Sequence, residues 1–164
     1  DASIGLKLNN ARAETVAEKA SFKTSFERHR CLIPANGFYE WQAVDEAGKT
    51  RKQPWYIAPA GAGGFFAMAG LLAAWKSPEG RDLVTACVFT TAANALMAPI
   101  HDRMPVILAP EDYERWMTAA PADAQTLIQP FADERMRAYP VSKAVGNVRN
   151  NSAALIAEIA PPVA

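Results

Sequence analysis

Residues 37–57 read GFYEWQAVDEAGKTRKQPWYI, and this stretch decides the fold class. It contains two strand-like runs, residues 37–41 and 55–57, rich in the aromatic side chains that strands favour. Between them, residues 45–49 have the composition of a hairpin connection. The pattern predicts two neighbouring strands joined by a tight turn.

Further strand-like runs lie on both sides of this hairpin. The most apolar are residues 65–72 and 83–91, and shorter ones occupy residues 31–33, 106–108 and 136–141. Single helices are expected between the strands. Ser21 is placed to cap one of them, with Phe22 and Phe26 one turn apart on its buried face.

Two later helices are expected to begin at prolines. Pro110, followed by two acidic residues, starts a helix whose apolar stripe comprises Tyr113, Trp116 and Met117. Pro121 starts the next, and residues 152–159 form a closing helix. Strands joined by tight turns, with helices inserted singly, predict an α+β fold with a largely antiparallel, twisted sheet.

Composition narrows the class of protein. The 164 residues fit one domain, and half of them are hydrophobic. Because 17 basic residues balance 17 acidic ones, the chain is not expected to coat a polyanion, although a local phosphate-binding strip fits. The sequence has no apolar run of about 20 residues, no signal-peptide pattern and only two cysteines, so we expect a cytoplasmic protein without a membrane partner.

The first of three polar clusters is residues 10–15, NARAET. Residues 10–19 are expected to form an exposed loop that enters a short helix. Asn10 or Thr15 would then cap that helix, and Glu14 would face its dipole. The alternative is a functional role for Asn10 and its neighbour Arg12.

The second cluster centres on Glu40. Strand alternation places Phe38, Glu40 and Gln42 on one face, with Tyr39 and Trp41 on the other. A carboxyl group beside aromatic rings is partly desolvated, which raises its pKa toward the range of a general acid. The alternative is a solvated strand face.

The third cluster is residues 100–105, IHDRMP. Pro105 favours an extended residue before it, so the cluster forms a shaped loop leading into a strand. His101 can exchange a proton near neutral pH. The alternative is a structural or merely exposed histidine.

Basic and thiol side chains complete the candidates. Arg12 and Arg103 each neighbour a candidate polar residue and suit phosphate binding. A second basic patch comprises Lys23, Arg28 and Arg30, with scattered solubilising charge as the alternative. Cys31 and Cys87 begin or occupy apolar strands, so both are expected to pack in the core; nearby cations lowering the pKa of Cys31 are the alternative.

Five blocks of this sequence occur in the order and approximate spacing of the SRAP family, the SOS-response-associated peptidases. The chain therefore resembles that family over nearly its whole length. The blocks are residues 10–15 (NARAET), 31–41 (CLIPANGFYEW), 52–54 (KQP), 101–105 (HDRMP) and 141–148 (VSKAVGNV).

The resemblance implies a barrel-like SRAP fold and covalent capture of abasic sites in single-stranded DNA. The family nucleophile is a first-residue cysteine, whose amine and thiol form a thiazolidine with the sugar aldehyde. The same cysteine also suits self-cleavage that removes the initiator methionine. Asn10 would orient the nucleophile or opened sugar. Glu40 would handle protons at the amine and thiol, and His101 would assist ring opening. Arg12 and Arg103 would hold the flanking phosphates.

Asp1 supplies an amine but no thiol. We therefore expect residues 1–164 to be a single SRAP domain, monomeric and lacking its N-terminal part, with no metal or cofactor. Two other functions stay open: a cysteine-dependent peptidase acting on other proteins, and a non-catalytic single-stranded-DNA-binding module.

Overall fold

The computed structural model describes residues 9–16, 19–46, 48–61 and 64–160. The chain forms two compact units, each assembled from segments that are distant in sequence. The first unit comprises Asp1–Ala35, Phe66–Ala92 and Met104–Phe131, and the second comprises Asn36–Phe65, Ala93–Arg103 and Ala132–Ala164.

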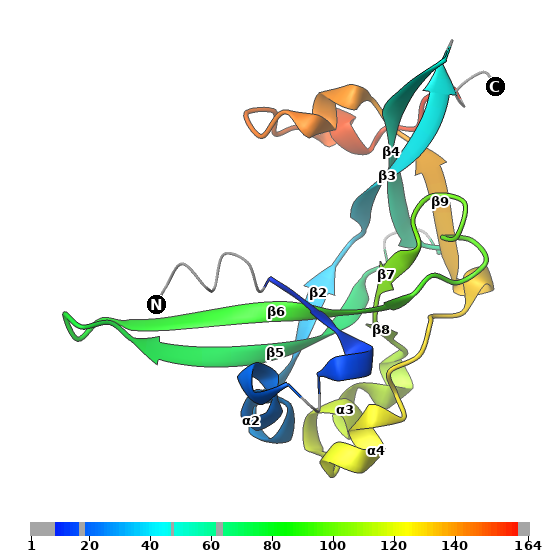
Figure 1. The fold of residues 1–164 in the computed structure, drawn as a ribbon. Coiled ribbons are helices and arrows are strands. Elements are labelled where there is room, and N and C mark those ends of the chain that lie inside the picture. Colours follow the sequence, from blue (N-terminus) through cyan, green and yellow to red (C-terminus); the bar gives the residue numbers. More distant parts are fainter. Residues whose placement is uncertain (1–8, 17–18, 47, 62–63, 161–164) are drawn as a thin grey trace. The chain divides into compact units, whose positions relative to one another are not determined.

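A six-stranded sheet forms the first unit (Figure 1). Its main order is β1-β6-β5-β2, while β7 pairs with β6 and β8 pairs with β5. Only β1–β6 is parallel among the pairs with a described register; β2–β5, β5–β6 and β5–β8 are antiparallel. The strands are β1 (Asn10–Arg12), β2 (Arg30–Ala35), β5 (Phe66–Lys76), β6 (Asp82–Ala92), β7 (Arg103–Pro105) and β8 (Ile107–Leu108).

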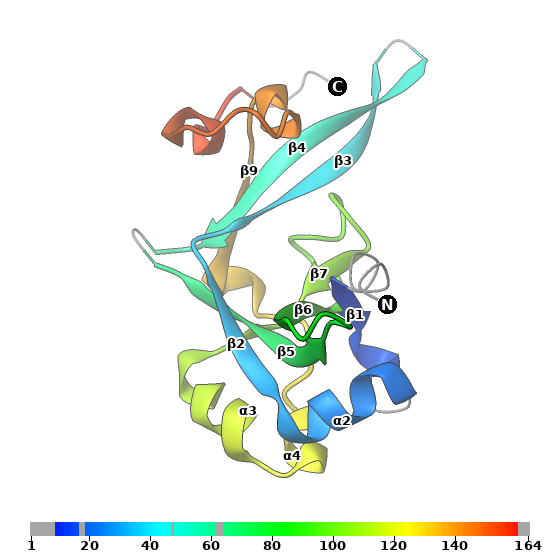
Figure 2. The same cartoon turned by 90° about the vertical axis from the view of Figure 1, so that its left-hand side faces the viewer.

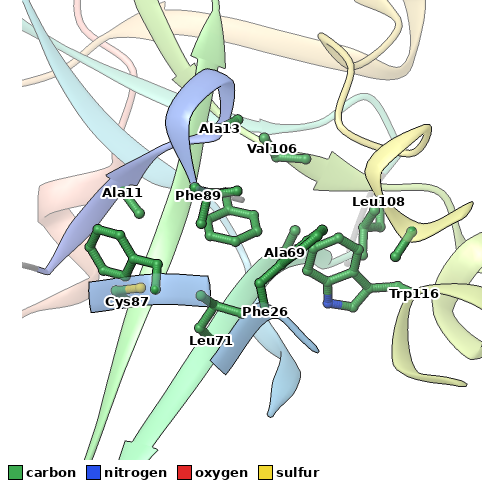
Figure 3. Packing of buried hydrophobic residues seen from close by; sticks show 13 residues of the cluster. Ala11, Ala13, Phe26, Ala69, Leu71, Cys87, Phe89, Val106, Leu108 and Trp116 are labelled. Atoms are coloured by element: carbon green, nitrogen blue, oxygen red, sulfur yellow. The ribbon is translucent and has the colours of Figure 1, made fainter. Parts of the chain in front are cut away.

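The helices of this unit lie on one side of its sheet (Figure 2). They are η1 (Ala13–Thr15), α2 (Ala20–Arg28), η2 (Pro110–Asp112), α3 (Tyr113–Thr118) and α4 (Pro121–Gln125). Phe26 of α2, Phe89 of β6 and Trp116 of α3 meet in the core, where the Phe89 and Trp116 rings lie edge to face with centroids 5.6 Å apart (Figure 3). Burial of these large rings stabilises this unit.

Arg30 ties the ends of two helices to β2. Its Nε donates to the Trp116 carbonyl at 2.6 Å, its Nη1 to the Phe26 carbonyl at 2.7 Å, and its Nη2 to the Ala119 carbonyl. The residue is only 8% exposed. The predicted surface patch of Lys23, Arg28 and Arg30 is therefore wrong for Arg30, because its guanidinium satisfies helix carbonyls inside the protein.

The second unit is built on a three-stranded antiparallel sheet, in the order β3-β4-β9 (Figure 1). The strands are β3 (Phe38–Glu46), β4 (Lys49–Pro59) and β9 (Met136–Pro140), with 3-10 turns η3 (Asp133–Arg135), η4 (Lys143–Gly146) and η5 (Ala153–Ile156). Tyr39, Tyr56 and Tyr139 lie side by side on one face, with tilted rings whose neighbouring centroids are 5.2 and 5.7 Å apart.

The predicted α+β class with a largely antiparallel sheet is confirmed, as are the hairpin of residues 37–57 and the burial of Phe22 and Phe26. Four local expectations were wrong. Residues 10–12 form a strand rather than a loop, because β6 offers them a pairing edge. Lys19, not Ser21, stands at the N-cap of α2. Met117 is 44% exposed, and the closing helix is only the 3-10 turn η5.

Candidate functional site

Glu40 lies on β3, where the hairpin holds it beside Trp55 of β4. The register pairs Glu40 with Trp55 and Gln42 with Gln53, so the predicted alternation along β3 is realised. The Glu40 side chain is half-buried. Burial raises the pKa of the Glu40 carboxyl group above its ordinary value, as the sequence predicted.

Gly37 lets the chain enter β3 in close contact with β4. A Cβ atom at this position would lie 2.5 Å from both the Ile57 carbonyl oxygen and the Tyr56 hydroxyl oxygen. Only a residue without a side chain fits there. The glycine therefore fixes the approach of the two strands just before Glu40.

His101 lies on a loop of residues 93–103 that is closed by its own hydrogen bonds. The Ala93 N–H donates to the Asp102 carbonyl at 3.1 Å, and the His101 N–H donates to the Met97 carbonyl at 2.9 Å. Asn94 adds a side-chain bond, since its Oδ1 accepts from the Met97 N–H at 2.9 Å. These bonds give the histidine a defined backbone.

The imidazole of His101 is oriented by its own loop. Its Nδ1 accepts a hydrogen bond from the Arg103 N–H at 2.9 Å, with the Arg103 carbonyl 3.1 Å and Asp102 Oδ1 3.3 Å away. In the neutral ring the Arg103 N–H favours a proton on Nε2, whereas the Arg103 carbonyl and Asp102 Oδ1 are acceptors for a proton on Nδ1. With the proton on Nε2, that nitrogen is available as a donor.

Glu40 and His101 are brought close enough to interact electrostatically. The positive charge of His101 lowers the pKa of Glu40, as do a hydrogen bond from the Trp41 backbone and the charge of Lys52. Asp102 raises it, and burial remains the largest influence. A carboxyl group with a raised pKa beside a histidine is a candidate for proton transfer.

Gln42 connects the strand of Glu40 with the loop of His101. Its Nε2 donates to the Pro99 carbonyl at 2.9 Å, and its Oε1 accepts from Trp55 Nε1 at 2.9 Å. Sequence reasoning placed Gln42 on the face of Glu40 but assigned it no role. Lys52 and Asp102 were likewise not selected, although their charges act on Glu40.

Asn10 and Arg12 lie on β1 of the first unit, and both are exposed. Thr15 Oγ1 donates to the Arg12 carbonyl at 3.5 Å, and η1 has no side-chain cap. Arg103, half-buried, directly follows the His101–Asp102 pair. The predicted convergence of Asn10 with Glu40 and His101 stays a prediction.

Cys31 and Cys87 are both buried, which confirms the predicted core packing. Burial raises the pKa of each thiol. A buried thiol with a raised pKa is a poor nucleophile.

Within the described residues, no group of three or more His, Cys, Asp or Glu side chains is arranged to hold a metal ion. None of the helices in the described ranges has the length and apolar character to cross a membrane.

Residues 1–148 match the family model described as SOS response associated peptidase (SRAP). The chain belongs to the SRAP family. Its SRAP relatives include the abasic site processing protein YoqW of Bacillus subtilis, which is 44% identical over 159 residues and matches 95% of this chain and 69% of its own length. The abasic site processing protein HMCES of Xenopus tropicalis is 37% identical, over 93% of this chain and 50% of its own.

Solved structures support the SRAP fold. A protein from Bacteroides thetaiotaomicron superimposes with a TM-score of 0.82 at 31% identity, covering 92% of this chain and 66% of its own. A protein from Bordetella bronchiseptica gives a TM-score of 0.71 at 28% identity. The chain thus spans about two-thirds of its bacterial SRAP relatives and about half of HMCES.

Proposed function

We propose that this SRAP chain carries the proton-transfer part of a site that captures abasic sites in single-stranded DNA. The observation that carries the proposal is the half-buried Glu40, whose pKa is raised by burial and which interacts with His101. YoqW, a relative named abasic site processing protein, is 44% identical to the chain, which supports the same substrate class.

The chemistry needs the kinds of groups present here. An abasic sugar is mostly a closed hemiacetal, and a donor such as His101 Nε2–H assists its opening to the aldehyde. An unprotonated amine then attacks the aldehyde carbon, and the oxygen leaves as water after two proton transfers. A thiol on the same residue adds to the resulting imine carbon, and its proton passes to the nitrogen. Glu40 accepts and returns these protons.

The nucleophile of this proposal is a first-residue cysteine, as the family resemblance implies. Cys31 and Cys87 do not fit the role because both are buried and have raised thiol pKa values. The same cysteine would remove the initiator methionine. In this proposal residues 1–164 are part of one SRAP domain that acts as a monomer.

The DNA side of the proposal uses Asn10, Arg12 and Arg103. Arg12 and Arg103 bind the phosphates that flank the lesion, and Asn10 orients the opened sugar. An exposed guanidinium on β1 is accessible to a DNA strand, which supports the role of Arg12.

The test compares the 164-residue chain with a version extended at its N-terminus by a family segment beginning Met-Cys. Each protein is incubated with a single-stranded oligonucleotide holding one abasic site and analysed after denaturation. We expect a stable adduct from the extended protein, none after its cysteine is changed to alanine, and slower formation with His101→Ala. A stable adduct from the 164-residue chain alone would refute the assigned nucleophile.

The same experiment separates the alternatives. Binding of the oligonucleotide without an adduct from the extended protein would favour a non-catalytic DNA-binding module. Cleavage of added unfolded proteins, lost on changing the cysteine to alanine, would favour a peptidase acting on other proteins.

A further inference from the structure

We propose that Gln42 is a positioning residue that sets the separation of Glu40 and His101 by tethering the loop of residues 93–103 to β3. This inference rests on the proposed function of the Glu40–His101 pair. It adds a residue that touches neither the substrate nor the reacting atoms.

The two bonds of Gln42 define the tether. Its amide nitrogen donates to the Pro99 carbonyl, 57 positions along the chain and two residues before His101. Its amide oxygen accepts from the indole N–H of Trp55, the residue paired with Glu40 across the hairpin. Because Trp55 holds the oxygen, the amide is oriented with its nitrogen toward the loop.

The loop transmits this constraint to His101 through short connections. Ile100 and His101 both donate from their backbone N–H groups to the Met97 carbonyl, at 2.8 and 2.9 Å. At its other end the loop is attached to β9, because Asn94 Nδ2 contacts Met136 Sδ at 3.4 Å. A closed loop fixed at Pro99 and at Asn94 carries His101 at a defined place relative to Glu40.

Positioning of this kind affects rate strongly, since misplacement of a catalytic group by about 1 Å can reduce a rate about 100-fold. Gln42→Met keeps the length and volume of the side chain and removes both hydrogen bonds. Tyr139→Phe is the matched control, because it removes one hydrogen bond, from Tyr139 Oη to the Ile156 carbonyl, elsewhere in the same unit.

The experiment measures the coupling between Glu40 and His101 directly in the 164-residue chain. The titration of the Glu40 carboxyl is followed by NMR with and without His101→Gln, in the wild-type, Gln42→Met and Tyr139→Phe backgrounds. Losing the His101 charge raises the pKa of Glu40 in the wild type, since that charge lowers it. Asp102 and Lys52, the other charges acting on Glu40, are unchanged throughout.

We expect the change in the pKa of Glu40 caused by His101→Gln to persist in Tyr139→Phe. In Gln42→Met this change should shrink at least by half. In the extended protein, Gln42→Met should slow adduct formation about tenfold or more while leaving DNA affinity unchanged. Undiminished coupling in Gln42→Met would overturn the inference. A different result would refute the proposed function alone. In that case His101→Gln changes the pKa of Glu40 in the wild type but not in Gln42→Met, and no extended protein forms an adduct.

Discussion

The Nδ1 atom of His101 accepts a hydrogen bond from the backbone N–H of Arg103 at 2.9 Å. This bond favours the Nε2–H form of the neutral ring, because the N–H proton of Arg103 points toward Nδ1. It also joins the candidate proton donor to the candidate phosphate-binding arginine.

The tautomer can be checked by nitrogen NMR. The chain has two histidines, so spectra of His29→Gln contain only the signals of His101. In the neutral ring we expect the Nδ1 resonance at the position of an unprotonated nitrogen and Nε2 at that of a protonated one. Equal populations of the two tautomers would contradict the hydrogen bond to Arg103.

Glu40→Gln is expected to stabilise the protein at neutral pH. Since burial raises the folded-state pKa of Glu40, the unfolded chain binds fewer protons between its own pKa, about 4.3, and the raised folded value. The Glu40 carboxyl group therefore makes its full contribution to the free energy of unfolding below about pH 4. This contribution is lost as the pH rises through the pKa of Glu40 in the folded protein. Urea unfolding at pH 7 and pH 3 tests this.

The gain from Glu40→Gln should be present at pH 7 and absent at pH 3. The control is Glu79→Gln, which changes an exposed carboxylate 4.0 Å from Arg81. Equal gains from both substitutions at pH 7 would assign the effect to net charge rather than to burial of Glu40.

Gly37→Ala is expected to destabilise the protein by about 1–3 kcal/mol, because the added methyl group overlaps the Ile57 carbonyl. Gly61→Ala is the matched control, since no atom lies within 4 Å of a Cβ there. Its effect should stay within about 0.5 kcal/mol. Thermal unfolding of both variants measures the difference, and similar stabilities would show that the two strands can separate freely at Gly37.

Arg30→Met is expected to destabilise the protein by about 2–4 kcal/mol, because three helix carbonyls lose a charged donor. Arg28→Met, exposed on the last turn of α2, should change stability by no more than about 0.5 kcal/mol. Chemical denaturation compares the two. A smaller loss of stability in Arg30→Met than in Arg28→Met would mean that the three carbonyls find other hydrogen-bond donors.

Arg12→Ala and Arg103→Ala are each expected to weaken binding of the extended protein to all single-stranded sequences alike. A phosphate contact carries no base information, and its loss should flatten the dependence of log affinity on log salt by about one unit. Arg81→Ala, at the exposed end of the β5–β6 hairpin, should leave the slope unchanged. Unchanged slopes for both test variants would place the DNA elsewhere.

Local periodicity in the sequence determined the strands and the orientation of their side chains. The alternation of residues 38–42 placed Glu40 and Gln42 on one face, because successive side chains of a strand point to opposite sides. The uncharged runs became β5 and β6, of which residues 66–71 are buried in the core, whereas residues 72–76 and 82–86 are exposed. The sequence also predicted the raised pKa of Glu40, which burial causes in the structure.

Only the tertiary structure decided which of these local pieces meet. β1 has three residues and no strand pattern, and it exists because it hydrogen-bonds to β6, 78 positions away where Asn10 pairs with Val88. The sequence predicts that Arg30 is a surface charge. In the structure its guanidinium donates to the carbonyls of Trp116 and Ala119, which come from a distant segment. Gln42 bonds to Trp55 within the hairpin, but its second partner, Pro99, comes from a segment 57 positions away. Contacts of this kind leave no periodic trace in the sequence, because they depend on the folded path of the whole chain.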